Sequence, residues 1–139
     1  MICNICPRKC NIDRSSAQGF CGESETLRVA RIAPHHFEEP PISGTRGSGT
    51  VFFTGCSLKC VFCQNFELSR SMRGKEISAY DLAEIFKELE NKGAHNVNLV
   101  NPTHYSDKII EALEIRKRVV IAPVNLANKF GLIILITSL

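Results

Sequence analysis

The sequence has no tryptophan, only 2 tyrosines and 2 methionines, and no cysteine beyond residue 63. It also lacks a long apolar run: the longest, Phe130 to Ile136, is too short to cross a bilayer, and the first residues lack the apolar stretch of a secretory signal. The 17 basic and 14 acidic residues are scattered, which argues against a nucleic-acid-binding protein. We therefore expect a cytoplasmic protein with neither a membrane nor a nucleic-acid partner.

The cysteines are unevenly placed along the chain. All 7 lie within the first 63 of 139 residues, and the odd number argues against a framework of disulfides. In a reducing compartment, cysteines spaced this closely indicate metal binding. Hydrophobic residues make up 44% and charged residues 22% of the chain, so we expect one ordinary globular domain.

Four segments differ in composition. Residues 1–25 hold four cysteines and little apolar periodicity, and we interpret them as a loop-rich knuckle around a metal. We interpret residues 26–49 as a connector with a short strand at Leu27–Ile32. Residues 50–118 alternate strand and helix patterns, and residues 119–139 form an atypical apolar tail.

The alternating segment predicts an α/β fold. Thr50–Thr54 and Asn96–Val100 are the predicted strands. Between them, Ser78 can cap a helix that runs to about Lys92 and ends at Gly93. The apolar face of this helix consists of Leu82, Ile85, Phe86 and Leu89.

A second helix is expected after the second strand. Ser106 is its expected cap, and Ile109, Ile110 and Leu113 are expected to face inward. The strand–helix–strand order predicts parallel strands with right-handed crossovers. In the tail, Val119–Ala122 and Leu132–Thr137 are two further candidate strands.

Cys56, Cys60 and Cys63 follow the first predicted strand of this segment with the spacing C-x3-C-x2-C. Thiolates are soft ligands that favour iron–sulfur clusters, zinc or copper(I). Three thiolates so close together can bind three corners of one cubane cluster, which leaves the fourth iron without a protein ligand. Open coordination positions are typical of catalytic metal sites.

This C-x3-C-x-aromatic-C loop resembles the signature loop of the radical S-adenosylmethionine (SAM) superfamily. The approach over Glu38–Phe53, with Cys3-x2-Cys6-Pro7-x2-Cys10 and Gly19-x-Cys21, resembles the branch related to pyruvate formate-lyase activating enzyme. The resemblance covers residues 3 to about 115. It implies a Cys-rich metal knuckle followed by the first βα units of a partial (β/α)6 barrel, with the site at the carboxyl ends of the strands.

The resemblance also implies an activity. The three thiolates would hold a [4Fe–4S] cluster, and SAM would chelate its open iron. Reductive cleavage of SAM would give a 5′-deoxyadenosyl radical that takes a hydrogen atom from a substrate, such as a glycyl-radical enzyme. A flavodoxin or ferredoxin would supply the electron, and no side chain is assigned a catalytic role.

Three residues receive cofactor-binding roles from the same resemblance. Phe62 would lie against the adenine, the alternative being an ordinary core residue. Many members of the family bind the methionine amino group with a Gly-Gly-Glu segment after the second strand. This chain has Asn101-Pro102-Thr103-His104 there, and Thr103 or His104 would substitute by hydrogen bonding.

Cys3, Cys6, Cys10 and Cys21 have the spacing C-x2-C-x3-C-x10-C. Four thiolates complete either a tetrahedral zinc site or a second cubane cluster, and the two stay open as alternatives. Both sites are closed, so we expect a structural or electron-relaying role rather than a catalytic one.

Another interpretation of Cys56, Cys60 and Cys63 is a structural zinc site completed by His104 or Cys21. The rival function is then a non-catalytic metal-binding module. A complete barrel needs more chain than follows Val51, and the alternation breaks near Arg116. We therefore expect a fragment or a frameshifted chain of a radical SAM enzyme, with an inactive fragment as a further alternative, and the sequence names neither a substrate nor an oligomeric state.

Overall fold

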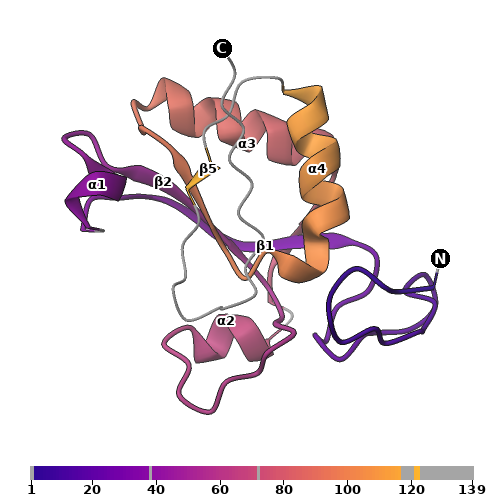
Figure 1. Ribbon diagram of the computed structural model, residues 1–139. Helices are drawn as coiled ribbons and strands as arrows, with labels where there is room; N and C mark the ends of the chain where they lie inside the picture. Colours follow the sequence, from indigo (N-terminus) through magenta and orange to yellow (C-terminus); the bar gives the residue numbers. More distant parts are fainter. Residues whose placement is uncertain (1, 38, 72, 117–120, 123–139) are drawn as a thin grey trace.

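The computed structural model describes residues 2–37, 39–71, 73–116 and 121–122. A turn-rich N-terminal segment precedes a single sheet with helices on one of its faces (Figure 1). In chain order the elements are β1 (Leu27–His35), α1 (Pro40–Ser43), β2 (Ser48–Phe53), α2 (Phe66–Arg70), β3 (Lys75–Ile77), α3 (Ala79–Asn91), β4 (Val97–Val100), a 3-10 turn η1 (Thr103–Tyr105), α4 (Ser106–Ile115) and β5 (Ile121–Ala122).

The strands are ordered β3-β1-β2-β4-β5 across the sheet. The β2–β4 and β4–β5 pairs are parallel, as the strand–helix–strand pattern predicts, and β1 pairs antiparallel with both β2 and β3. The strand expected at Leu27–Ile32 is therefore confirmed but longer than expected. Because β1 lies between two other strands, residues 26–49 belong to the sheet and do more than link two segments.

The first predicted helix is confirmed as α3, and its ends have the expected causes. The Ser78 hydroxyl accepts from the Asp81 backbone N–H, and the Asp81 carboxylate accepts from the Ser78 N–H, which is a reciprocal capping box. Gly93 takes φ +89° just beyond the last turn. The predicted apolar face packs inward: Leu82, Phe86 and Leu89 are buried, and Ile85 is half-buried.

The second helix is confirmed as α4, with two corrections. Ser106 is the first helical residue rather than the cap, and no side chain caps α4, because η1 runs directly into it. Ile109 and Leu113 face inward as expected, whereas Ile110 is 44% exposed and Ala112 is buried in its place. The α-helical period directs positions 109, 112 and 113 to the core and turns position 110 away.

Helices α3 and α4 contact each other and lie together against the sheet (Figure 1). The core between helices and sheet includes Phe86, Leu82 and Ile109 from the helices with Val51 and Leu99 from the strands. None of the helices within the described residues is long and apolar enough to span a membrane. Of the two strands expected in the tail, Val119–Ala122 is observed in part as β5 (Ile121–Ala122), its first two residues lying outside the described residues, as does all of Leu132–Thr137.

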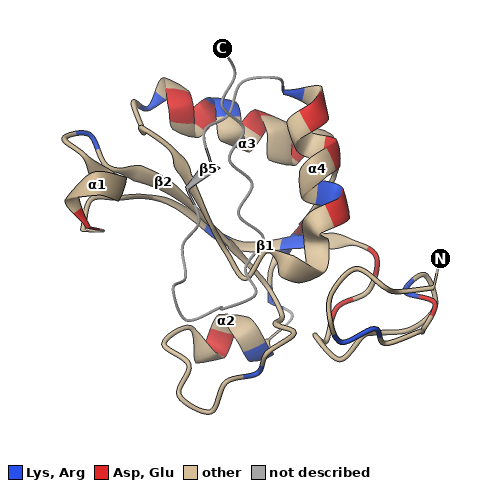
Figure 2. Cartoon of the chain, in the orientation of Figure 1, with Lys and Arg blue, Asp and Glu red and all other residues tan. Residues whose placement is uncertain are grey.

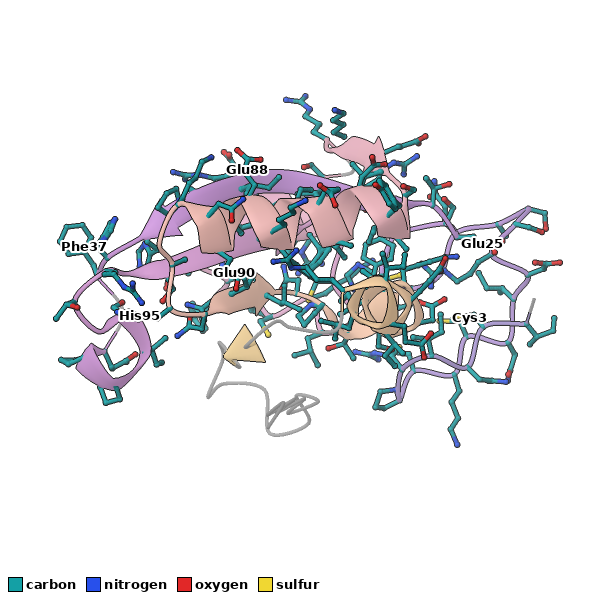
Figure 3. The ribbon with its side chains drawn as sticks, turned by 90° about the horizontal axis from the view of Figure 1, so that it is seen from above. Cys3, Glu25, Phe37, Glu88, Glu90 and His95 are labelled. Carbon is teal, nitrogen blue, oxygen red and sulfur yellow. The ribbon has the colours of Figure 1, made fainter. Side chains whose placement is uncertain are left out.

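Residues 2–26 contain no helix and no regular strand. Two backbone hydrogen bonds close a loop in the first half of this segment, from Cys3 N–H to Ile12 O at 2.8 Å and from Asn11 N–H to Cys3 O at 3.1 Å. Figure 3 shows this segment, with Cys3 and Glu25 labelled, at one end of the molecule, while Phe37 and His95 lie at the other.

Candidate metal and cofactor site

The loops that follow β2 and β4 leave the sheet at the same edge, because these neighbouring strands are parallel with Phe52 opposite Val100. The first loop carries the three closely spaced cysteines, and the second carries Thr103 and His104. A hydrogen bond joins the two loops between His104 Nε2 and the Thr54 carbonyl at 2.8 Å. The sequence-predicted residues therefore gather at the carboxyl ends of the parallel strands.

The cysteine loop presents its three thiols at different depths. Cys56 is buried where the loop leaves β2, Cys63 is half-buried, and Cys60 is exposed at the turn. Lys59, just before the turn cysteine, takes φ +51°. Arg70 of α2 steadies this turn, because its Nη2 donates to the Lys59 carbonyl at 2.7 Å.

Two of the sulfur atoms of this loop have hydrogen-bonding neighbours. The Leu58 backbone N–H donates to Cys56 Sγ at 3.4 Å, and the Ser69 hydroxyl, which donates to the Phe66 carbonyl at 3.0 Å, lies 3.5 Å from Cys63 Sγ. Such contacts to sulfur tune iron–sulfur clusters. All seven cysteines are free thiols.

Within the described part of the chain, no three His, Cys, Asp or Glu side chains are already arranged to hold a metal ion. The fit to a cluster therefore rests on the donor set: three soft thiolates on one loop, with N–H and O–H groups beside two of them. The exposure of Cys60 leaves its sulfur on the solvent side of the loop, where an incoming metal centre can reach it.

Phe62 lies next to the third cysteine and is 99% exposed. Its neighbour Val61 is 84% exposed. Both apolar side chains project into solvent from the loop of the three cysteines, where a ligand of that loop can reach them. The alternative that Phe62 is a core residue is wrong in this structure, and its contact with adenine stays a prediction.

The two candidate residues of the second loop differ in accessibility. Thr103 is half-buried at the start of η1, whereas His104 is only 2% exposed. Burial lowers the pKa of His104 from 6.5 to about 4, and the Arg14 guanidinium adds to this effect. His104 is therefore neutral near pH 7, and its hydrogen bond to the Thr54 carbonyl holds the two loops together. Of the pair, Thr103 is the better placed to meet a cofactor.

The same hydrogen bond bears on the zinc alternative. The Nε2–H of His104 donates to the Thr54 carbonyl, which leaves the Nδ1 lone pair of this ring as a possible metal ligand, so the zinc alternative with His104 stays open. The Cys21 sulfur lies near that of Cys10: a Cβ atom built on Gly19 would be 3.3 Å from Cys21 Sγ and 3.8 Å from Cys10 Sγ. A side chain at position 19 would therefore be tight against the Cys21 sulfur and in ordinary contact with the Cys10 sulfur.

The N-terminal cysteines fold into one small segment. Cys3, Cys6 and Cys21 are each 8% exposed, and Cys10 is half-buried. The Phe20 N–H donates to Cys10 Sγ at 3.4 Å. Burial raises the pKa of the Cys21 thiol, so its thiolate needs a cation to stabilise it.

The N-terminal segment packs directly on the cysteine loop. The Cys56 N–H donates to the Cys21 carbonyl at 3.1 Å, and Arg8 Nε donates to the Ser57 carbonyl at 2.9 Å. The Phe20 ring lies between two cations, with Arg8 Cζ at 4.1 Å and Lys59 Nζ at 4.5 Å from its centroid. The two groups of cysteines thus belong to adjoining parts of one site.

Glu23 fills the space behind the first cysteine of the loop. It is fully buried, and its Oε2 lies 3.2 Å from Arg28 Nη1, while Arg28 also binds the exposed Glu76 at 2.5 Å. A Cβ atom on Gly55 would be only 2.6 Å from Glu23 Cγ and 2.8 Å from the Cys21 carbonyl. Gly55 also takes φ +71°, so glycine is required there on two counts.

Arg14 joins the N-terminal segment to the second loop. It is 5% exposed, its Nη1 donates to the His104 carbonyl at 2.8 Å, and its Nη2 donates to the Ser24 carbonyl. Its guanidinium carbon lies 5.6 Å from the ring centroid of Tyr105, which is itself fully buried. Burial, and then the nearby Glu23 carboxylate, raise the pKa of Tyr105.

Sequence reasoning found the cysteines but missed the residues that hold their loops. These residues are not spaced as in a recognisable motif: they are Arg14, Glu23, Arg28 and Gly55. Nothing in the sequence around the three charged residues indicates that they are buried. The signal that could have found Gly55 is its position between a buried strand and the first cysteine, where a tight turn is needed.

Comparisons with known proteins agree with this geometry. Residues 50–138 match the family described as the Radical SAM superfamily. A protein of Methanocaldococcus jannaschii, described as uncharacterized, is 33% identical over 119 residues, which cover 80% of this chain. The chain spans about a third of that relative, 34% of its length. No solved structure matches the chain.

Proposed function

This chain belongs to the radical SAM superfamily, and from that membership we propose that its cysteine loop holds a [4Fe–4S] cluster for the reductive cleavage of SAM. The observation that carries the proposal is the place of Cys56, Cys60 and Cys63. They lie on one loop at the carboxyl end of β2, inside the matched residues and beside the loop that follows β4. This is where α/β folds with parallel strands bind their ligands.

When bound, the cluster would supply one electron to the SAM sulfonium, which yields methionine and a 5′-deoxyadenosyl radical able to take a hydrogen atom from a substrate. The chain's own residues would position these groups. The three thiolates would hold the cluster, the exposed ring of Phe62 would lie against the adenine, and the Thr103 hydroxyl would bind the methionine end.

The finer assignment is to the branch related to pyruvate formate-lyase activating enzyme, with a glycyl-radical enzyme as the substrate. The Cys-rich segment before the barrel units supports it, because this segment packs on the cysteine loop through the Cys56–Cys21 and Arg8–Ser57 hydrogen bonds. The match to the relative covers 34% of the relative's length, and turnover by this chain is part of the proposal.

We assign the four N-terminal cysteines to a second metal, either a cluster or zinc. The Cys10 and Cys21 sulfurs, which both lie within 4 Å of a Cβ atom built on Gly19, support such a site. A flavodoxin or ferredoxin is the proposed electron donor. Arg8, Lys59 and Arg70 surround the cysteine loop with positive charge, which favours an acidic protein partner.

The test is anaerobic reconstitution of the full chain with iron and sulfide, then reduction in the presence of SAM. We expect a brown protein that releases 5′-deoxyadenosine. Cys56→Ala, Cys60→Ala and Cys63→Ala should each abolish the release. Cys3→Ala is the comparison, because it removes one of the four N-terminal cysteines and leaves Cys56, Cys60 and Cys63 in place. It should lower the total metal content.

Two results would contradict the proposal. One is a colourless protein that holds zinc at the loop cysteines and no iron, which would favour a structural metal-binding module. The other is unchanged iron content and SAM cleavage in the three loop variants.

A further inference from the structure

The outer edge of β1 is only partly covered. β3 pairs with it over Leu27–Val29. The residue before β3, Gly74, lies against the end of β2, since an added Cβ would be 2.7 Å from Thr54 Cγ2, so the chain leaves β1 at this point. Among the described residues, no other strand pairs with β1 on the side away from β2.

The open part of this edge offers hydrogen-bonding groups at Ile32. Gly49 of β2 donates its N–H to the Asn96 carbonyl beside β4, so its backbone does not bond to its β1 partner, Pro34. Backbone groups alternate between the two sides of a strand, so those of Pro34 and Ile32 point outward. Proline has no N–H, and of the two it is therefore Ile32 that offers both a donor and an acceptor to an added strand.

A groove of about 700 Å³ lies between this edge and α3. Ile32 is the register partner of Val51, and paired residues share a face of the sheet, so the Ile32 side chain lies on the side of the core and the helices. It is nevertheless 44% exposed. Ile77 and Ile85, which line the same groove, are half-buried. The apolar floor of the groove is therefore incompletely covered.

The walls of the groove carry charges of both signs, and Figure 2 shows both colours along α3. The charged residues that line it are Arg31, Lys75, Lys87, Asp81, Glu84 and Glu88. On the exposed side of α3, Glu84 Oε2 and Lys87 Nζ lie 3.7 Å apart. Three cations and three carboxylates give no preference for a strongly acidic or strongly basic partner. They suit a surface that carries the same set, because each sign can then face the other.

We propose that two copies of the chain pair through the open edge of β1 and form a dimer whose two-fold axis passes beside Ile32. A two-fold axis relates two copies of one strand in antiparallel directions, which is how β1 already pairs with both of its neighbours. The Ile32 N–H of each copy would donate to the Ile32 carbonyl of the other, and the two side chains would cover the apolar floor. Glu84 of one copy would face Lys87 of the other.

The dimer goes beyond the proposed function and does not depend on it. Neither Thr103 nor any of the seven cysteines lines the groove, so the candidate site would stay accessible in each copy. SAM cleavage and self-association are therefore measured separately, and the failure of one leaves the other intact.

The test is sedimentation equilibrium of the full, anaerobically reconstituted chain over a range of concentrations. A reductant is present, because all seven cysteines are free thiols that cross-link copies on oxidation. Ile32→Lys would place two like charges opposite each other at the axis, and it changes an exposed side chain, so the fold should be kept. Ile110→Lys is the matched control, because Ile110 is also 44% exposed but lies on α4, outside the groove.

We expect the original chain and Ile110→Lys to approach twice the 15.5 kDa mass of the chain as the concentration rises. Ile32→Lys should self-associate at least about tenfold more weakly, as expected for the central residue of an interface. A chain that stays a monomer at every concentration, or equal self-association of the two variants, would overturn the proposal.

Two further measurements test the geometry of the pairing. In the unchanged protein, the Ile32 N–H should exchange with solvent more slowly in concentrated than in dilute solution, and equal exchange rates would exclude pairing at this edge. Glu84→Lys and Lys87→Glu should each weaken self-association, because like charges would then face each other across the axis. Mixing these two variants restores opposite charges and should restore the dimer; a mixture that associates no better than either variant alone would contradict the two-fold arrangement.

Discussion

Replacing Gly55 by alanine tests whether the N-terminal segment sets the position of the cysteine loop. The new Cβ would lie 2.6 Å from Glu23 Cγ and 2.8 Å from the Cys21 carbonyl, both closer than real contacts allow. Glu23 is fully buried and Cys21 contributes backbone, so neither can move without disturbing its neighbours. The Cys56–Cys21 hydrogen bond of 3.1 Å is the contact expected to break.

The expected loss of stability has two parts. A non-glycine residue in the left-handed region costs about 1–2 kcal/mol. Overpacking a filled interior costs about 1–3 kcal/mol more. We therefore expect Gly55→Ala to lower the free energy of unfolding by about 2–5 kcal/mol, a large fraction of the stability of a small domain.

Gly93→Ala is the matched control. Gly93 also has a positive φ, +89°, but an added Cβ would meet nothing within 4 Å. It should therefore cost only the backbone part, about 1–2 kcal/mol. The difference between the two variants isolates the contact with Glu23 and Cys21.

Two measurements decide the matter. Urea denaturation gives the free energy of unfolding of each variant, and iron analysis after anaerobic reconstitution gives the cluster content. Gly55→Ala should lose iron, because its strain falls on the residue before Cys56, while Gly93→Ala should keep it. Equal free energies of unfolding and equal iron contents in the two variants would refute the close contact between Gly55 and Glu23.

Three further predictions concern the folded chain. Burial lowers the pKa of His104 from 6.5 to about 4, so the unfolded state binds a proton at a higher pH than the folded state does. The free energy of unfolding should therefore decrease by about 3 kcal/mol as the pH falls from 6.5 to 4. His104→Gln should remove this pH dependence from the denaturation curves. Ser78→Ala should lower the free energy of unfolding by about 1 kcal/mol by removing the capping box, and Ser106→Ala, which removes no cap, should change it little in the same assay. Phe86→Ala should cost about 3–5 kcal/mol in urea denaturation, against less than about 1 kcal/mol for the 44% exposed Ile110→Ala; similar losses for the two would contradict the assigned core.

The parts of the fold that could be predicted from sequence are those with local causes. The capped helix from Ser78 to Gly93 depends on residues within one or two turns of each other, and the parallel pairing of β2 with β4 follows from strand–helix–strand order. Ile110 was predicted to face the core because it is hydrophobic, but its position on the helix directs it toward solvent, where it is 44% exposed. The cap predicted at Ser106 is wrong because a 3-10 turn runs directly into α4, and no residue type marks such a turn.

The site could be predicted only as far as its ligands. Cysteine spacing identifies the loop because chemistry restricts which residues bind a soft metal. The residues that hold this loop in place are distant in sequence. Glu23 packs against Gly55, and Arg14 donates a hydrogen bond to the carbonyl of His104, 90 positions away. Contacts between residues so far apart leave no periodic pattern, so they appear only when the chain is folded.

The N-terminal segment contacts both loops of the site, and this suggests an order of assembly. Its hydrogen bonds reach Cys56 and Ser57 in the first loop, and Arg14 reaches His104 in the second. The two loops are in turn joined through His104 and Thr54. A segment without helix or regular strand has little stability of its own, so a metal at its four cysteines would fix the surface against which the cysteine loop packs. Loading of the first metal should therefore increase the affinity of the loop for its cluster, since the loop would no longer lose as much conformational entropy on binding.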